Sequence, residues 1–289
     1  MKKIVILGCE NSHADSFLKY IRDCAEFSEV EVVGVYSNDE EAMKKLHDTF
    51  GVPTMKSYDE AVGKVDGVIV TARHGKFHLE YVRPYLSSVK AVFIDKPFTI
   101  DEDEAVELAR LCRDNGVRLT GGSCLKFASI VTEAREAVRA NEGKVLGATL
   151  SAPVSMTNDY GNFFFYSQHL VEMVCEAFGR FPTSVAAYPC GANTTVIFRY
   201  PQYTVTGIFT EGVYTYAATL HIGNEVKSSV LGAGLTPCFY AEFDAFYKVL
   251  TGGEQQEPTE SFVAPVFVLN AIDRSLKSGK EEAVNTFTL

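Results

Sequence analysis

The feature that most constrains the fold is the alternation of short apolar runs with amphipathic segments along the first 120 residues. The first run, residues 4–8, is continuously apolar, as expected for a central parallel strand buried on both faces. A helical segment follows over 12–24, with Ser12 as its expected cap. The other expected elements are strands over 30–36, 67–72, 91–95 and 117–121 and helices over 38–50, 76–86 and 101–115. This rhythm predicts an α/β fold with a doubly wound parallel sheet and right-handed crossovers.

The pattern changes after residue 121. From about residue 185 to residue 231, apolar and polar residues alternate strictly, which is typical of half-buried antiparallel strands. The other expected elements are a strand over 145–151 and helices over 128–141, 166–178, 238–251 and 261–278. Because 289 residues exceed one ordinary core, we predict two domains. Residues 1–120 form the doubly wound domain, and residues 121–289 form an α+β domain with an open, largely antiparallel sheet.

Charge and composition exclude several classes of partner. The chain has 27 Lys and Arg against 37 Asp and Glu, a net charge of −10, so it lacks the basic field that nucleic acids and acidic membranes attract. No apolar run approaches the roughly 20 residues of a spanning helix, and the start of the chain is expected to be a strand and not a signal peptide. The seven cysteines are scattered without a Cys-x-x-Cys pair. We therefore expect a reduced, cytoplasmic protein without a zinc cluster.

Ligands of doubly wound sheets bind at the carboxyl ends of the strands, so the turn after the first strand is the first candidate site. A dinucleotide turn has glycines where this chain has Gly8, Glu10 and His13, and only the first remains. A Cβ and a carboxylate at position 10 oppose the approach of a pyrophosphate. The helix N-terminus at Asn11 and Ser12, with His13 as a further donor, still favours an anion. The turn alone therefore leaves dinucleotide binding and a plain structural turn open.

The later strand ends add further candidate ligand contacts. After the second strand, Ser37 stands where an acidic residue would bind a ribose hydroxyl, and it can donate to a 2′-hydroxyl or a 2′-phosphate, which leaves NAD and NADP open. Thr71, Arg73 and His78 surround the end of the 67–72 strand, either as ligand contacts or as part of a solvated loop. After the 91–95 strand, Lys96 precedes a proline that favours an extended backbone. It is either a fixed cation at the site or half of a structural charge pair with Asp95.

Four motifs follow one another in the chain in an order that one enzyme family shares. They are the Asp-Lys-Pro at 95–97, the segment 66–78 that ends in a histidine, the helix over 168–179, and the terminal helix over 271–279. They resemble the Glu-Lys-Pro signature, the histidine-ended segment, the Gly-x-His-x-x-Asp…Phe-Gly helix and the terminal helix of the glucose–fructose oxidoreductase, inositol dehydrogenase and rhizopine-catabolism (Gfo/Idh/MocA) family. The similarity extends across most of the chain.

The resemblance implies a Rossmann domain that binds NAD or NADP and a hydride transfer to or from a carbohydrate-like small molecule. It implies that Lys96 polarises the reacting hydroxyl and that His169 takes its proton as general base. Lys126 stands where relatives often have an arginine that approaches the cofactor or the substrate. The residues expected to bind the cofactor are Gly8, Asn11, Ser12, His13, Ser37, Thr71, Arg73, His78, Asp95 and Lys126. No metal is implied, because Lys96 takes the electrostatic role of one.

The polar residues of the family's catalytic helix depart from its pattern. The aspartate usually found four residues before the histidine is Phe165, Ser167 replaces a glycine, and Glu172 replaces a later aspartate. Two functional classes therefore stay open: an NAD(P)-dependent oxidoreductase, and a non-catalytic ligand-binding or regulatory protein on the same scaffold. We predict the oxidoreductase, because Lys96 and His169 hold their expected positions.

Aromatic residues in the second half suggest further surfaces. The tract 163–166 can stack on a sugar ring or form part of a core or subunit interface. Four tyrosines are expected on a sheet face that a second subunit covers: Tyr200, Tyr203, Tyr214 and Tyr216. We therefore expect a homo-oligomer, a dimer or tetramer, formed through the C-terminal sheet.

Overall fold

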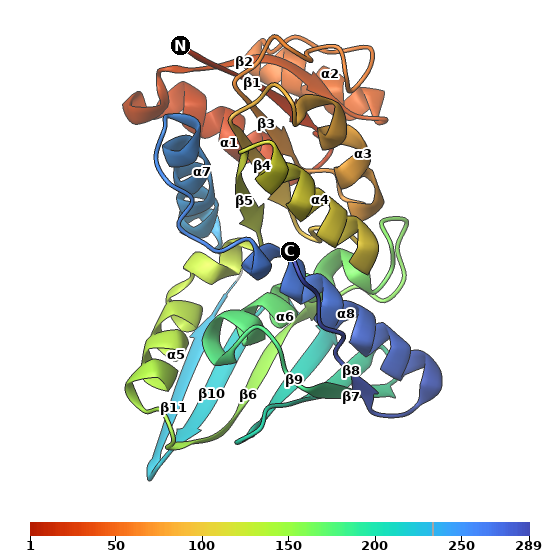
Figure 1. Ribbon diagram of the computed structural model, residues 1–289, viewed down its shortest axis with the longest axis vertical. Coiled ribbons are helices and arrows are strands. Elements are labelled where there is room, and N and C mark those ends of the chain that lie inside the picture. Colours follow the sequence, from red (N-terminus) through yellow and green to blue (C-terminus); the bar gives the residue numbers. More distant parts are fainter. Residues whose placement is uncertain (233) are drawn as a thin grey trace. The chain divides into compact units, whose positions relative to one another are not determined.

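The computed structural model describes residues 1–232 and 234–289, which divide into two compact units (Figure 1). The first unit comprises residues 1–122, 239–262 and 289, and the second comprises residues 123–238 and 263–288. The segment 239–262 thus packs with the first unit, although it lies late in the sequence. The division into functional domains at residue 120 stays a prediction.

The first unit contains a five-stranded sheet in the order β2-β1-β3-β4-β5, with every neighbouring pair parallel. Its strands are β1 (Lys2–Leu7), β2 (Val30–Tyr36), β3 (Gly67–Val70), β4 (Ala91–Asp95) and β5 (Arg118–Gly122). The predicted doubly wound sheet is confirmed. The chain leaves β1 toward β2 and returns on its other side as β3, so the topological switch point lies between β1 and β3.

Helices of several kinds connect these strands. They are α1 (Ser12–Asp23), the 3₁₀ turn η1 (Ala25–Phe27), α2 (Glu40–Phe50), η2 (Gly75–Phe77), α3 (His78–Val82), η3 (Arg83–Tyr85) and α4 (Glu102–Asp114). The prediction of a single helix over 76–86 is wrong, because α3 is short and lies between two 3₁₀ turns. Pro84 lies at the start of η3, where it has no N–H for an α-helical bond. Asn11, and not Ser12, caps α1 by accepting from the His13 N–H.

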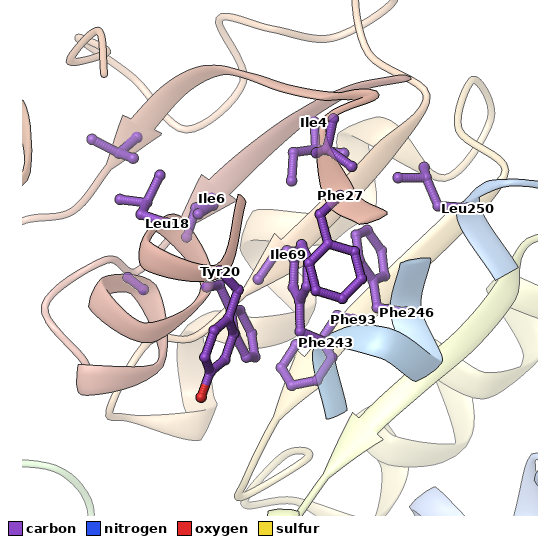
Figure 2. Close-up of a cluster of buried hydrophobic side chains, with 14 of the residues drawn as sticks. Ile4, Ile6, Leu18, Tyr20, Phe27, Ile69, Phe93, Phe243, Phe246 and Leu250 are labelled. Carbon is purple, nitrogen blue, oxygen red and sulfur yellow. The ribbon is translucent and has the colours of Figure 1, made fainter. Parts of the chain in front are cut away.

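The core of the first unit is completed by α7 (Thr236–Leu250), whose residues from Phe239 onward belong to this unit. Figure 2 shows Phe243 and Phe246 of α7 beside Phe27 and Phe93. The Phe27 and Phe243 rings meet edge to face, with centroids 4.8 Å apart. Burial of such rings is strongly stabilising, so a segment distant in sequence becomes part of the Rossmann-like core.

The second unit contains a seven-stranded sheet in the order β11-β10-β6-β9-β8-β7-β12. Its strands are β6 (Val145–Val154), β7 (Ser184–Cys190), β8 (Asn193–Arg199), β9 (Thr204–Glu211), β10 (Tyr216–Ile222), β11 (Glu225–Leu231) and β12 (Glu282–Ala283). Among the described strands, β6 and β9 form the one parallel pair, and the other neighbours are antiparallel. The predicted open, largely antiparallel sheet is confirmed.

Helices cover one face of this second sheet. The helical elements of the unit are η4 (Cys124–Phe127), α5 (Ser129–Ala140), α6 (Phe164–Phe178) and the part of α8 (Glu260–Ser278) from Val263 onward. In Figure 1, α5 and α6 lie against the sheet, where α5 contacts β10 and α6 contacts β6 and β9. Along β10, Tyr216, Ala218 and Leu220 are buried and alternate with half-buried residues of the other face.

No helix in the described part of the chain is long and apolar enough to cross a bilayer.

Candidate active-site residues in the two units

The turn between β1 and α1 depends on Gly8. Its φ of +73° lies in the left-handed region, and a Cβ there would lie 2.3 Å from the Cα of Ala72. Only glycine therefore permits this approach of the turn to the end of β3. Thr71 joins the same two strand ends, because its Oγ1 donates to the Gly8 carbonyl at 3.0 Å. A tight glycine turn thus lies at the switch point, as a dinucleotide site requires.

Glu10 connects the ends of three strands. Its Oε2 accepts from the Ser37 hydroxyl at 2.7 Å, directly after β2, and its Oε1 accepts from the Arg73 N–H at 2.9 Å, after β3. The Ser37 oxygen in turn accepts from the Asp39 N–H at 3.0 Å. From the sequence, Glu10 is expected only to oppose a phosphate, and this bridge is not predicted. Two features of the sequence could have predicted it: Glu10 adds a carboxylate after the first strand, and Ser37 stands where an acidic residue is expected after the second.

His13 lies in a buried network of charged groups within the first unit. Its Nδ1 is 3.3 Å from Asp95 Oδ2 and its Nε2 is 3.2 Å from Glu242 Oε2, and Asn11 Nδ2 donates to Asp95 Oδ2 at 2.7 Å. Burial alone lowers the pKa of His13, but the two carboxylates outweigh burial and the nearby Lys96, so its pKa is raised. Glu242 comes from α7 and was missed, because nothing local connects α7 with the turn.

The loop residues after β3 and β4 are also anchored inside the first unit. Lys96 is buried directly after β4, and its backbone N–H donates to Asp95 Oδ1 at 2.7 Å. His78 is fully buried, with Nε2 2.8 Å from the Ala72 carbonyl and Nδ1 3.2 Å from the Phe98 carbonyl. Burial lowers the pKa of His78. His78 therefore ties the loop after β3 to the loop after β4. The remaining candidate, Ser12, is exposed in the first turn of α1.

The second unit contains a separate buried polar cluster around His169 of α6. The Nδ1 of His169 is 2.7 Å from Ser123 Oγ, and the Ser123 N–H donates to Glu172 Oε1 at 2.9 Å. Lys126 Nζ is 3.2 Å from the same Glu172 oxygen, and Gln168 Nε2 donates to the other at 2.9 Å. Burial raises the pKa of Glu172 to about 7, although Lys126, Gln168 and the Ser123 N–H all oppose the rise. Lys126 and His169 thus belong to one cluster.

The contact with Ser123 decides what His169 can do. For Nε2 to accept a proton, Nδ1 must carry the ring hydrogen and donate it to Ser123 Oγ, which also accepts from the Leu125 N–H at 3.2 Å. The Tyr166 and Tyr216 rings meet the imidazole edge to face, with centroids 5.3 and 6.1 Å away. Ser123 was missed in the sequence, where only the i−4 and i+3 neighbours of His169 were considered.

The aromatic tract and the tyrosines are largely explained within the second unit. Phe163 is buried and packs on Phe209 at 5.5 Å between centroids. The expectation that Tyr216 faces a partner is wrong, because it is only 2% exposed on the inner face of β10. Tyr200 and Tyr203 donate to the carbonyls of Gly179 and Phe178 at the end of α6, which accounts for their hydroxyls. Tyr214 remains 57% exposed.

Comparison with known proteins finds an enzyme family that the first part of the chain matches. Residues 2–123 match the Gfo/Idh/MocA family model, described as an oxidoreductase family with an NAD-binding Rossmann fold. Oxidoreductase YhhX of Escherichia coli (strain K12), itself uncharacterized, is 28% identical over 138 residues, which are 44% of this chain and 40% of that protein. Glucose-6-phosphate 3-dehydrogenase of Bacillus subtilis (strain 168) is 28% identical over 157 residues, 53% of this chain and 42% of that enzyme. The matches thus span about two fifths of these relatives.

The fold likeness extends over both units. The crystal structure of scyllo-inositol dehydrogenase from Lactobacillus casei, with bound NAD(H) and scyllo-inositol, aligns with a TM-score of 0.84 over 99% of this chain and 100% of that chain. At 13% sequence identity this match establishes the fold alone. Residues 2–123 thus match the model of the Gfo/Idh/MocA oxidoreductase family, and the likeness of fold covers 99% of the chain.

Proposed function

We propose that the protein is an NAD(P)-dependent oxidoreductase that transfers a hydride between nicotinamide and a hydroxyl-bearing carbon of a sugar, polyol or related small molecule. The observation that carries this proposal is the Gly8 turn at the switch point of a sheet that matches an NAD-binding family, with Lys96 directly after β4 of the same sheet. Glucose-6-phosphate 3-dehydrogenase and scyllo-inositol dehydrogenase, among the similar proteins, support a sugar or polyol as the substrate class.

The first unit fits a dinucleotide. Gly8 permits the tight turn after β1, and a cavity of about 670 Å³ borders Ser37 at the end of β2. Gly8, Asn11 and Ser12 would hold the pyrophosphate, while Ser37, Thr71 and Arg73 would contact the rest of the cofactor. His13, His78 and Asp95 would support these loops, and Lys126 of the second unit would approach the cofactor or the substrate. The cofactor, when bound, supplies or takes the hydride.

The chain's own side chains handle the proton and the charge on oxygen. The Lys96 ammonium would hold the reacting hydroxyl oxygen and stabilise the negative charge that develops on it. The Nε2 of His169 would take the hydroxyl proton, while Ser123 holds the hydrogen on Nδ1. Ser123 would thereby take over the positioning role of the aspartate that Phe165 replaces.

Replacing Ser123 by alanine is expected to lower kcat by about tenfold to a hundredfold, because the imidazole loses the contact that fixes its tautomer. KM should change little, and the pH at which kcat reaches half its maximum should shift, which a merely structural role would not produce. Ser129→Ala, an exposed serine at the start of α5, is the matched control. An unchanged kcat and pH profile in Ser123→Ala would contradict the role of Ser123.

The proposed function is tested by titrating the purified, nucleotide-free protein with NAD, NADH, NADP and NADPH, followed by calorimetry and nicotinamide fluorescence. We expect micromolar binding of at least one pair, and then turnover of a compound in a panel of polyols, sugars and sugar acids. Folded protein that binds none of the four at millimolar concentration would refute the oxidoreductase.

A non-catalytic ligand-binding or regulatory protein is the second candidate. One observation favours it: Phe165 packs against Tyr160 and Tyr166, with centroids 5.0 and 5.2 Å apart, so the usual acid is replaced by an aromatic cluster. This candidate predicts that ligands bind without turnover and that Lys96→Ala leaves their binding unchanged.

We further propose that the protein is cytoplasmic. Within the described residues the seven cysteines are free thiols, in keeping with a reducing compartment.

We also propose that the protein is a homo-oligomer. Val226 and Val230 on the edge strand β11 are 62% and 72% exposed, which favours a second copy of the chain on this part of the sheet. Sedimentation of the full chain tests the oligomer.

A further inference from the structure

The side chain of Glu10 occupies a position that explains two departures of the sequence together. We propose that Glu10 supplies the carboxylate that binds the adenosine ribose and makes the protein selective for NAD over NADP. This inference rests on the proposed function, because it requires that the first unit binds a dinucleotide.

Two hydrogen bonds fix the carboxylate at the carboxyl end of the sheet. Glu10 Oε2 lies 2.7 Å from the hydroxyl of Ser37, the first residue after β2, and Oε1 lies 2.9 Å from the Arg73 N–H, after β3. The side chain is only partly buried, so a ligand can reach it. A carboxylate offers about four acceptor sites, so the Ser37 and Arg73 donors leave capacity for a ribose diol.

The position of this carboxylate compensates for the residue missing after β2. In dinucleotide-binding folds an acidic residue at the end of the second strand accepts from the ribose 2′-hydroxyl. This chain has Ser37 there, and the Glu10 carboxylate is hydrogen-bonded to it. The acidic residue is therefore absent from the end of β2 and present in the β1–α1 turn, but its carboxylate still lies beside β2. Either Ser37 or Glu10 alone would weaken a dinucleotide site, whereas the two together preserve a carboxylate acceptor for the ribose.

The charge of Glu10 sets the expected selectivity. A ribose 2′-hydroxyl can donate to the carboxylate, whereas a 2′-phosphate brings about 1.5 to 2 negative charges against it. Cations are also present: Lys44 and Lys56 line the cavity beside Ser37, together with Glu40. Lys44 is paired with Asp48 on α2. The Glu10 carboxylate lies 2.7 Å from the Ser37 hydroxyl, and we infer that it outweighs these cations.

The test compares the affinities of NADH and NADPH for the wild type and Glu10→Gln, measured by nicotinamide fluorescence and calorimetry on the full chain. Gln keeps the shape of the side chain and removes its charge. We expect the wild type to bind NADH at least about tenfold more tightly than NADPH, and Glu10→Gln to reduce that ratio by about tenfold. Glu41→Gln, an exposed glutamate of α2, removes the same charge and should leave the ratio unchanged.

The outcomes separate the inference from the function on which it rests. Equal affinities in the wild type, or a ratio that Glu10→Gln leaves unchanged, would overturn the role of Glu10 while leaving the dinucleotide site intact. Dinucleotide binding that appears only in Glu10→Gln or Glu10→Gly would also overturn it, by showing that the carboxylate blocks the site. If neither cofactor binds to any of these folded proteins, the proposed function itself fails.

Discussion

Replacement of Lys96 by alanine is expected to lower kcat by about 10³-fold, with dinucleotide affinity changed by less than about threefold. Lys96 is buried directly after β4, so its ammonium is held at the carboxyl edge of the sheet where ligands of this fold bind. In the proposed reaction, the Lys96 ammonium stabilises the negative charge that develops on the hydroxyl oxygen, so we expect its removal to lower the rate more than the binding of substrate and cofactor. Steady-state kinetics and cofactor titration of the same preparation measure both quantities.

Two further variants make this result specific. Lys96→Met keeps most of the side-chain volume and should be as inactive as Lys96→Ala, which separates loss of charge from a packing defect. Lys90→Ala removes an exposed lysine just before β4 and should keep full activity. A Lys96→Ala protein that retains more than about a tenth of the wild-type kcat would show that Lys96 does not act on the reacting oxygen.

The first sheet could be predicted from the sequence because its strands leave a local signature. Strands such as β1 and β4 are buried on both faces and therefore appear as continuous apolar runs. The helix expected over 76–86 failed because Pro84 ends α3, a detail that apolar periodicity does not include. The place of α7 in the first unit could not be predicted. It depends on Phe243 and Phe246 meeting rings from distant segments, and their local pattern fits any amphipathic helix.

In the candidate site, too, local features could be predicted from the sequence and tertiary contacts could not. The positions of Ser37 and Lys96 follow from the rule that ligands bind at strand ends, and such positions can be read directly from the sequence. The side chains that contact these residues cannot be read from the sequence in this way. The contacts of Glu10 with Ser37, of His13 with Glu242 and of Ser123 with His169 each join segments that meet only through the tertiary fold. The sequence therefore predicts candidate residues at the strand ends, but it does not predict the groups that hydrogen-bond to them or shift their pKa values.

The strongest effect on stability is expected at the buried network of His13, Asp95 and Glu242. Glu242→Gln should lower the free energy of unfolding by about 2–3 kcal/mol near pH 6, somewhat less than a fully unpaired buried charge costs, because Asp95 remains beside His13. Because the pKa of His13 is raised in the folded protein, its stabilising contribution is fully present below its unfolded pKa. That contribution is lost as the pH rises through the folded pKa. Urea unfolding from about pH 6 to about pH 9 measures this dependence for the wild type and the variant.

The pH dependence distinguishes a charge effect from a loss of packing. Since Glu242 raises the pKa of His13, its replacement brings the folded pKa closer to the unfolded value, and the difference between the two proteins should shrink as the pH rises. Lys96 faces the same imidazole and acts in the opposite direction, so the net effect belongs to the network as a whole. Glu254→Gln, an exposed glutamate after α7, should behave as the wild type at every pH. A Glu242→Gln defect of constant size across this range would mean that Glu242 contributes through packing alone, and that His13 is not held in its charged form by the two carboxylates.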